Sequence, residues 1–209
     1  MSDHAKDGDI VIPYVKAAPH QTSRRKGSRR MVRGGLVGML SLLLCVGCAV
    51  TTMIVTEGGT TFTSERYRFS VAVPEGDFHR VSASDTILTL TDRNTGVSMT
   101  IRATKDRYAH MEEPPSLEYI ARHLFFYVED KVIESLTSIT LAGEGGEIPA
   151  VFIRLSGTFE ETPLVFFACV SRYGGYVYDL VLWSPPRYAE EGLSVFEALV
   201  GSFMFLDGR

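Results

Sequence analysis

Alternating apolar and polar residues mark β-strands in the first half of the chain. In YRFSVAV (67–73), the residues at 67, 69, 71 and 73 are apolar or aromatic and share one face. TILTLTD (86–92) and VSMTIRAT (97–104) alternate in the same way, and the RNTG between them contains Asn and Gly, which tolerate a positive φ. Because successive side chains in a strand point to opposite faces, we predict three strands here, the last two forming a hairpin.

A helical period follows Pro114-Pro115-Ser116. Ser116 is placed to cap a helix that we predict to run to about Ser135. Its apolar stripe recurs at spacings of three and four residues and contains Leu117, Ile120, Ala121, Leu124, Val128 and Val132. A second helix, opened by Ser184-Pro185-Pro186, is predicted to close the chain with Leu193, Phe196, Val200 and Phe203 on its apolar face.

Three long apolar segments lie between the two predicted helices: AVFIRLSGTF (150–159), PLVFFACVSRY (163–173) and YVYDLVLW (176–183). They are apolar on both faces, so we expect strands that are covered on both sides. The step Tyr173-Gly174-Gly175-Tyr176 predicts a tight antiparallel hairpin. The fold class is therefore predicted as α+β, with an antiparallel sheet of about six to seven strands flanked by two main helices over residues 65–209.

An uncharged run, GGLVGMLSLLLCVGCAVTTMIVT (34–56), precedes this domain and follows a basic stretch. Positive charge before an apolar run favours export of everything after it. LLLCVGCAV resembles a bacterial lipoprotein signal, in which Cys48 becomes the lipid-modified first residue, although Cys45 stands where that signal has Leu. The alternative is a single transmembrane helix of about 33 Å, long enough to cross a hydrocarbon core of about 30 Å.

The chain thus divides into four parts. Residues 1–33 form a basic cytoplasmic tail, or precede a true start at Met31; residues 34–55 are the lipoprotein signal or transmembrane anchor. Residues 56–64, rich in Gly and Thr, are expected to be a linker to the domain at 65–209. We therefore expect a bacterial envelope protein, held in the membrane with its domain on the periplasmic side.

Composition and charge indicate the class of protein and argue against some partners. The 209 residues are 45% hydrophobic and 22% charged, as in a globular protein. Residues 1–33 carry eight basic and three acidic residues, a balance of +5, whereas the remainder has a balance of −9. An acidic domain argues against nucleic acid as a partner. Cys169 lies in an apolar strand and is expected to be a buried small residue, and the cysteine spacing fits no metal site or cofactor.

Residues that could carry catalysis are scattered. His79, His110 and His123 are dispersed, Glu118 and Glu129 do not lie four residues from His123, and no serine lies in G-x-S-x-G. GEGGE (143–147) lacks the Lys of a phosphate loop and predicts a turn. We therefore predict no catalytic, cofactor-binding or metal-binding residue. A hydrolase would need His123 or His79 beside an acid and a nucleophile.

The second half of the domain offers a candidate interaction surface instead: Tyr173, Tyr176, Asp179 and Trp183. Asp179 interrupts an apolar strand. If it is buried, it needs a partner such as Arg154 or Arg172; otherwise it lies on an exposed face.

The order of these segments also resembles a known family. ERYRFSVAVPEGD, the pair LTD and GVSMTI, SLEYIARHL, LAGEGGEIPAVFIRL, YGGYVYDLVLWSP and the terminal FEALVGSFMFL follow one another as in the PsbP/Mog-like fold, and are similar to the bacterial DcrB-type lipoproteins. The resemblance covers about residues 62–206. It implies a largely non-catalytic family, which includes photosystem extrinsic subunits and envelope proteins, and it supplies no active-site motif.

Together these patterns predict a membrane-tethered accessory module that binds or helps to assemble another envelope protein. One alternative is a carrier or sensor that holds a small apolar ligand between sheet and helix. The other alternative is the hydrolase described above.

Overall fold

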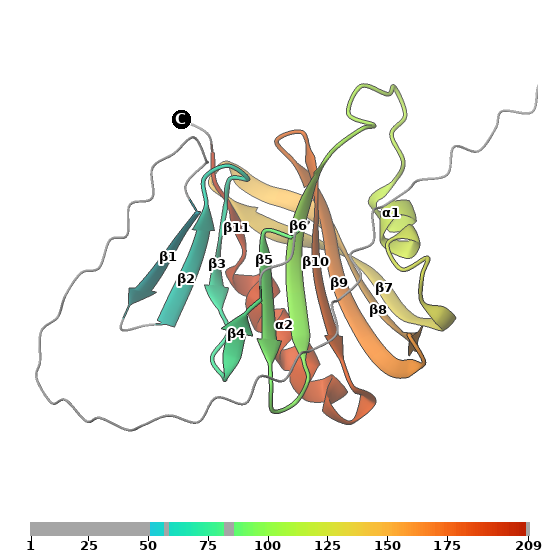
Figure 1. Ribbon diagram of the computed structural model, residues 1–209. Helices are drawn as coiled ribbons and strands as arrows, with labels where there is room; N and C mark the ends of the chain where they lie inside the picture. The colour runs from blue at the N-terminus through green and yellow to red at the C-terminus, as the bar shows by residue number, and fades with distance from the viewer. Residues whose placement is uncertain (1–50, 57–58, 82–85, 208–209) are drawn as a thin grey trace, which may run out of the picture.

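The computed structural model describes residues 51–56, 59–81 and 86–207. Within these residues the chain forms eleven strands in one sheet, in the order β1-β2-β3-β11-β7-β8-β9-β10-β6-β5-β4 (Figure 1). The strands are β1 (Thr51–Thr56), β2 (Gly59–Ser64), β3 (Phe69–Val73), β4 (Phe78–Arg80), β5 (Leu88–Asp92), β6 (Ser98–Lys105), β7 (Glu129–Gly143), β8 (Gly146–Phe159), β9 (Thr162–Tyr173), β10 (Tyr176–Ser184) and β11 (Met204–Phe205). The described helices are α1 (Leu117–His123), the 3-10 turn η1 (Pro186–Tyr188) and α2 (Ala189–Ser202).

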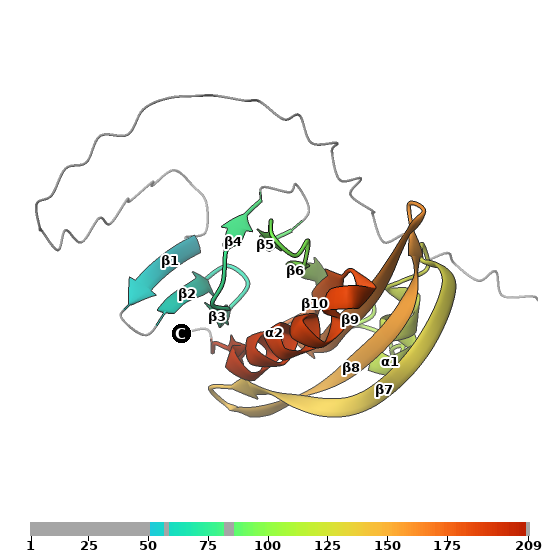
Figure 2. The ribbon, with the colours of Figure 1, turned by 90° about the horizontal axis from the view of Figure 1, so that it is seen from below.

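The sheet is strongly curled, and α2 lies inside the curve (Figure 2). The curl brings the two ends of the strand order toward each other, since the guanidinium of Arg80 on β4 lies 5.6 Å from the ring centre of Phe62 on β2. The described strands pair antiparallel except where β11 runs parallel to β7. We call the face that packs on α2 the inner face and the opposite one the outer face.

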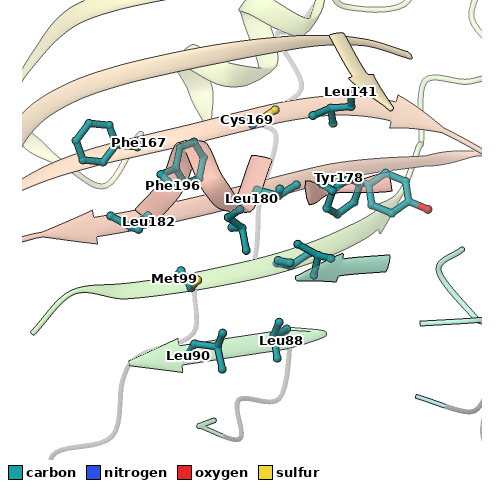
Figure 3. Close-up of a cluster of buried hydrophobic side chains, with 14 of the residues drawn as sticks. Leu88, Leu90, Met99, Leu141, Phe167, Cys169, Tyr178, Leu180, Leu182 and Phe196 are labelled. Atoms are coloured by element: carbon teal, nitrogen blue, oxygen red, sulfur yellow. The ribbon is translucent and has the colours of Figure 1, made fainter. Parts of the chain in front are cut away.

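The inner face carries the larger core, which joins strands from both halves of the sheet to α2. Phe167, Cys169, Leu180 and Leu182 project from neighbouring strands toward Phe196 of the helix (Figure 3). The aromatic rings of β3, α2 and the C-terminal segment are in direct contact, with 5.0 Å between the ring centres of Phe69 and Phe203. Phe196 and Leu199 of α2 are fully buried in this layer. Packed side chains therefore occupy the space between sheet and helix at these positions.

The outer face of β8, β9 and β10 is covered by α1 and the turn that follows it. Phe125 packs on Phe166 of β9 with 5.4 Å between ring centres, and Val151, Ala168 and Val181 lie in the same buried cluster. The apolar character of both faces of β9 therefore predicted correctly that the strand is covered on both sides. The predicted turns at RNTG, GEGGE and Tyr173–Tyr176 are also confirmed, as is the Ser116 cap, whose hydroxyl accepts the N–H of Tyr119 at 3.1 Å.

The predicted fold class is wrong in its proportions. The described chain is mostly β, with eleven strands instead of six to seven, a parallel pair in the sheet, and two short helices in place of two main ones. The largest error concerns the helix expected to run to Ser135: α1 ends at His123, and β7 begins at Glu129. β-branched residues within β7, such as Val132, Ile133 and Ile139, favour a strand, and β7 pairs with β8 over most of its length. Val132, assigned to the helix stripe, is 59% exposed.

The N-terminal expectations fall partly on residues outside the described ranges, namely residues 1–33 and most of 34–55, including Cys48. Thr51–Thr56, at the end of the expected signal or anchor and the start of the expected linker, forms β1, and Gly59–Ser64, expected to be linker, forms β2. Phe62 explains the difference for β2, because it is fully buried in the inner core. None of the described helices is long and apolar enough to span a membrane.

Candidate functional site

Asp179, the most unusual residue of the predicted surface, is buried on the outer face. Its carboxylate accepts a hydrogen bond from Arg102 Nε at 2.6 Å, and the two residues lie directly opposite each other on β10 and β6. Burial raises the pKa of the Asp179 carboxyl, while the Arg102 charge and hydrogen bond oppose that shift. Asp179 therefore holds strands together, with Arg102 as its partner and not the expected Arg154 or Arg172.

The two arginines that were expected beside Asp179 bind other acids. Arg172 Nε lies 3.0 Å from Asp106 just beyond β6, and that carboxylate is 6% exposed. Arg154 lies on the inner face, where its Nε is 2.6 Å from Glu134 on β7 and its Nη2 is 3.3 Å from Glu190 on α2. These ion pairs link strands and a helix, so their charged groups already have structural partners.

Tyr173 and Tyr176 lie close together, one on each side of the Gly174–Gly175 turn. The Tyr173 hydroxyl donates to Asp207 at 2.5 Å, and this hydrogen bond raises the pKa of the phenol. Tyr176 packs edge-on against Tyr67, with 5.6 Å between ring centres. The buried Tyr178 joins them by donating its hydroxyl to the Tyr67 carbonyl at 2.7 Å. We call this part of the molecule, defined by Tyr67, Tyr173, Tyr176 and Tyr178, the tyrosine end.

Trp183 does not belong to the tyrosine end. It lies near the other end of β10, about 23 Å away at strand rise, and packs with the outer cluster, whereas Tyr176 and Tyr178 face the inner core. The predicted four-residue surface is thus not assembled as one patch. The sequence contained the necessary signal: residues 176 and 183 are seven apart, and an odd separation in a strand places two side chains on opposite faces.

Charged residues surround the tyrosine end in two groups. Four basic side chains are exposed here. Arg66 and Arg68 lie on the β2–β3 turn, Lys105 is the last residue of β6, and Arg107 follows it. Arg66 places its guanidinium 5.1 Å from the centre of the Tyr67 ring. Acids lie on the β7–β8 turn and the C-terminal segment, where Glu144 Oε2 accepts the N–H of Asp207 at 2.8 Å.

The segment that contains α1 exposes two large aromatic residues to solvent. Tyr119 on α1 is 42% exposed, and Phe126 in the following turn is 57% exposed. Their neighbour Phe125 is fully buried, so the turn is anchored to the sheet while Phe126 points away from it. Lys131 strengthens the connection by donating to the carbonyls of Arg122 and Phe125 at 3.5 and 3.3 Å. An apolar ring held outward on a fixed turn suits contact with another protein.

The residues considered for catalysis lie in separate places. His123 Nδ1 is 2.7 Å from the Tyr119 carbonyl, and its ring stacks on Tyr119. His79 Nε2 is 3.3 Å from Asp77, with both side chains largely open to solvent. Cys169 is buried as predicted, and desolvation raises the pKa of its thiol to about 12. Among the described residues, no three His, Cys, Asp or Glu side chains are grouped to hold a metal ion.

Comparison with solved structures identifies the architecture. The structure of cyanobacterial PsbP (CyanoP) from Synechocystis sp. PCC 6803 superposes with a TM-score of 0.53 and 8% identity over 78% of this chain and 98% of that one. The chain has a PsbP-like fold. At this identity the likeness establishes the fold alone, and the finer resemblance to DcrB-type lipoproteins stays a prediction.

Other comparisons add less. LpqN of Mycobacterium tuberculosis, described as involved in cell envelope biogenesis, matches with a TM-score of 0.49 and 12% identity over 74% of this chain and 90% of that one, which is too low to support an argument. No family model matches the chain, and no curated protein matches it.

Proposed function

We propose that this chain is a membrane-tethered extracytoplasmic accessory module, without catalytic activity, that binds another envelope protein. The observation that carries the binding role is the outward Phe126, which is 57% exposed next to a fully buried Phe125. The charged and polar groups of the described core support the non-catalytic part. Asp179, Asp106 and Arg154 bind oppositely charged residues, and the Tyr178 hydroxyl bonds a backbone carbonyl.

The start of β1 supports a tether at Cys48 over an uncleaved anchor. β1 takes Thr51–Thr56 into the sheet, which leaves residues 34–50 for a membrane helix. Seventeen residues give about 25 Å of helix, shorter than a hydrocarbon core of about 30 Å. Lipidation of Cys48 instead needs no spanning helix in the mature chain and places the lipid three residues before the sheet.

Two experiments test these parts separately. Intact mass of the protein isolated from its native membrane is expected to show a chain that begins at a lipid-modified Cys48; the mass of the whole unmodified chain would remove the lipid tether. For the binding role, a photo-crosslinking residue is placed at Phe126 in the native membrane. The matched position is Glu197, which is exposed on α2.

The expected result is one specific envelope protein crosslinked from position 126 and absent from position 197. Binding of that purified protein should then weaken about tenfold or more in Phe126→Ala, because aromatic residues at the centre of an interface carry most of its energy. Equal crosslinking at both positions, or unchanged affinity in Phe126→Ala, would refute the binding role.

A further inference from the structure

We infer that the tyrosine end docks onto the anionic headgroups of the membrane that holds the tether. This inference rests on the proposed membrane tether, and it adds an orientation and a lipid partner that the tether alone does not require. The occupant is a phospholipid surface, and a second protein at the same end is an outcome that the experiment below detects.

The register of the first two strands places the tether at this end of the molecule. β1 and β2 are antiparallel, and Thr51 lies opposite Ser64. The start of β1 is therefore beside the end of β2, next to the turn that holds Arg66, Tyr67 and Arg68. In Figure 1 the start of β1, the β2–β3 turn and the β9–β10 turn lie together at the top of the sheet.

The reach of the tether is short. Two residues separate Cys48 from Thr51, and the three steps along the chain extend by at most about 11 Å. A lipid on Cys48 therefore keeps the tyrosine end near the headgroups, whereas the other end of β10, nine residues long, lies about 30 Å further along the sheet. Among the described residues, the start of β1 and the adjacent β2–β3 turn with Tyr67 are thus held near the headgroups.

The chemistry of this end matches that position. Tyrosine is favoured at the boundary between lipid and water, and exposed Lys or Arg side chains bind anionic headgroups. Tyr67 and Tyr176 pack together at 5.6 Å, Arg66 lies over Tyr67 at 5.1 Å, and Lys105 is the register partner of Tyr176. The basic and aromatic side chains therefore form a connected set.

Acidic side chains are also present at the tyrosine end, and they would repel anionic headgroups. Glu65 is exposed on the β2–β3 turn, and Asp106 is held by Arg172 at 3.0 Å. Glu144 and Asp207 contact each other on the β7–β8 turn and the C-terminal segment. The loop that follows β6 also carries the exposed Glu112 and Glu113. The turn next to the tether keeps Arg66 and Arg68 against Glu65 alone, so we place the contact with lipid on that side of the tyrosine end.

The opposite end of the sheet offers a matched control. Arg187 lies over the Tyr188 ring at 4.9 Å, which reproduces the Arg66–Tyr67 arrangement at the other end of β10. Arg93, on the β5–β6 turn, is exposed at the same end as Arg187. Replacing these residues changes charge and aromatic content as much as the matching replacements at the tyrosine end, but far from the tether.

The experiment uses the mature lipid-modified protein, isolated from its native membrane and reconstituted in vesicles, with Trp183→Phe as background. Tyr67→Trp or Tyr188→Trp then provides one fluorescent probe at either end. Vesicles contain phosphatidylcholine with or without phosphatidylglycerol, and brominated lipid quenches a tryptophan that touches the bilayer. We expect strong quenching at position 67 in phosphatidylglycerol vesicles and little at position 188. If circular dichroism shows that Tyr67→Trp disturbs the fold, Tyr176→Trp serves as the probe instead.

Charge reversal completes the test. Arg66→Glu/Lys105→Glu should remove the quenching at position 67, because each basic residue near an anionic surface contributes about fivefold in affinity. Arg93→Glu/Arg187→Glu should leave it unchanged. Equal quenching at both ends, no dependence on phosphatidylglycerol, or no quenching at position 67 in vesicles that the chain does bind would overturn the docking, and the last result would favour a protein as the occupant of this end. Failure of the chain to float with the vesicles would overturn the tether itself, which separates the two conclusions.

Discussion

A buried ion pair joins β6 to β10 near the middle of the sheet. Arg102 and Asp179 are separated by 2.6 Å, and their side chains are 17% and 9% exposed. Two unit charges centred about 4 Å apart attract by about 4 kcal/mol at an effective dielectric constant of about 20. Burial nevertheless raises the pKa of Asp179, so the free energy of desolvation outweighs this attraction. The pair is therefore expected to add little net stability while being costly to break.

Arg102→Met tests the cost of breaking it. The substitution leaves the Asp179 carboxylate buried without this partner, and we expect the free energy of unfolding to fall by about 3–5 kcal/mol at neutral pH. The loss should shrink as the pH falls. Removing Arg102 removes both effects that lower the pKa of Asp179, so in the variant this pKa lies further above the unfolded value of about 3.9. The folded variant therefore holds more protons than its unfolded state between the two values, and its stability declines as the pH rises through that window.

Arg102→Met/Asp179→Leu is the matched double variant, because Val177 and Val181 flank position 179 on the same apolar face. Replacing both charges removes the desolvation cost together with the attraction, so we expect stability equal to the wild type or up to about 4 kcal/mol higher. Urea unfolding at neutral and mildly acidic pH measures the wild type, Arg102→Met, Asp179→Leu and the double variant. A loss below about 1 kcal/mol in Arg102→Met, or a double variant as unstable as the sum of the two single variants, would refute this account.

Three further predictions concern a close-packed glycine, a buried cysteine and a turn. Gly157→Ala should lower the free energy of unfolding by about 1–3 kcal/mol in urea, since its Cβ would lie 2.4 Å from Val128 Cγ1 and 2.7 Å from the Glu129 carbonyl. Cys169, with a thiol pKa of about 12, should resist thiol reagents at pH 8 until urea unfolds the chain. Replacing Glu160-Glu161 by Asn-Gly should raise the melting temperature and add roughly 1–2 kcal/mol, because both residues hold a positive φ, 46° and 64°; an unchanged melting temperature would contradict this.

The sequence predicted best those features that local pattern decides. Strands β5 and β6 follow from alternation, β8, β9 and β10 from long apolar segments, and their turns from Gly and Asn positions. The stretch after His123 was assigned wrongly because Leu124, Val128 and Val132 match a helical period by coincidence. In β7, which pairs with β8, Ile133 packs against the outer cluster while Val132 is exposed, and only the partner strand decides between the two patterns.

Contacts between distant segments were beyond local pattern. Arg102 lies 77 residues before Asp179, and no pattern within either strand predicts that β6 lies beside β10. The packing of Tyr67 on Tyr176 depends on the curl of the whole sheet in the same way. The predicted surface therefore included Tyr173 and Tyr176, which share a turn, but missed Tyr67 and its neighbouring arginines.

The two-residue strand β11 has a consequence for the order of folding. Among the described strands it lies between β3 and β7, through Met204 and Phe205. The first three strands are therefore joined to the rest of the sheet by residues that follow all the other described strands in the chain. A nascent chain lacking those residues cannot close the sheet, and long-range pairing of this kind is slow. Closure of the sheet thus waits until β11 has followed the ten other described strands out of the ribosome.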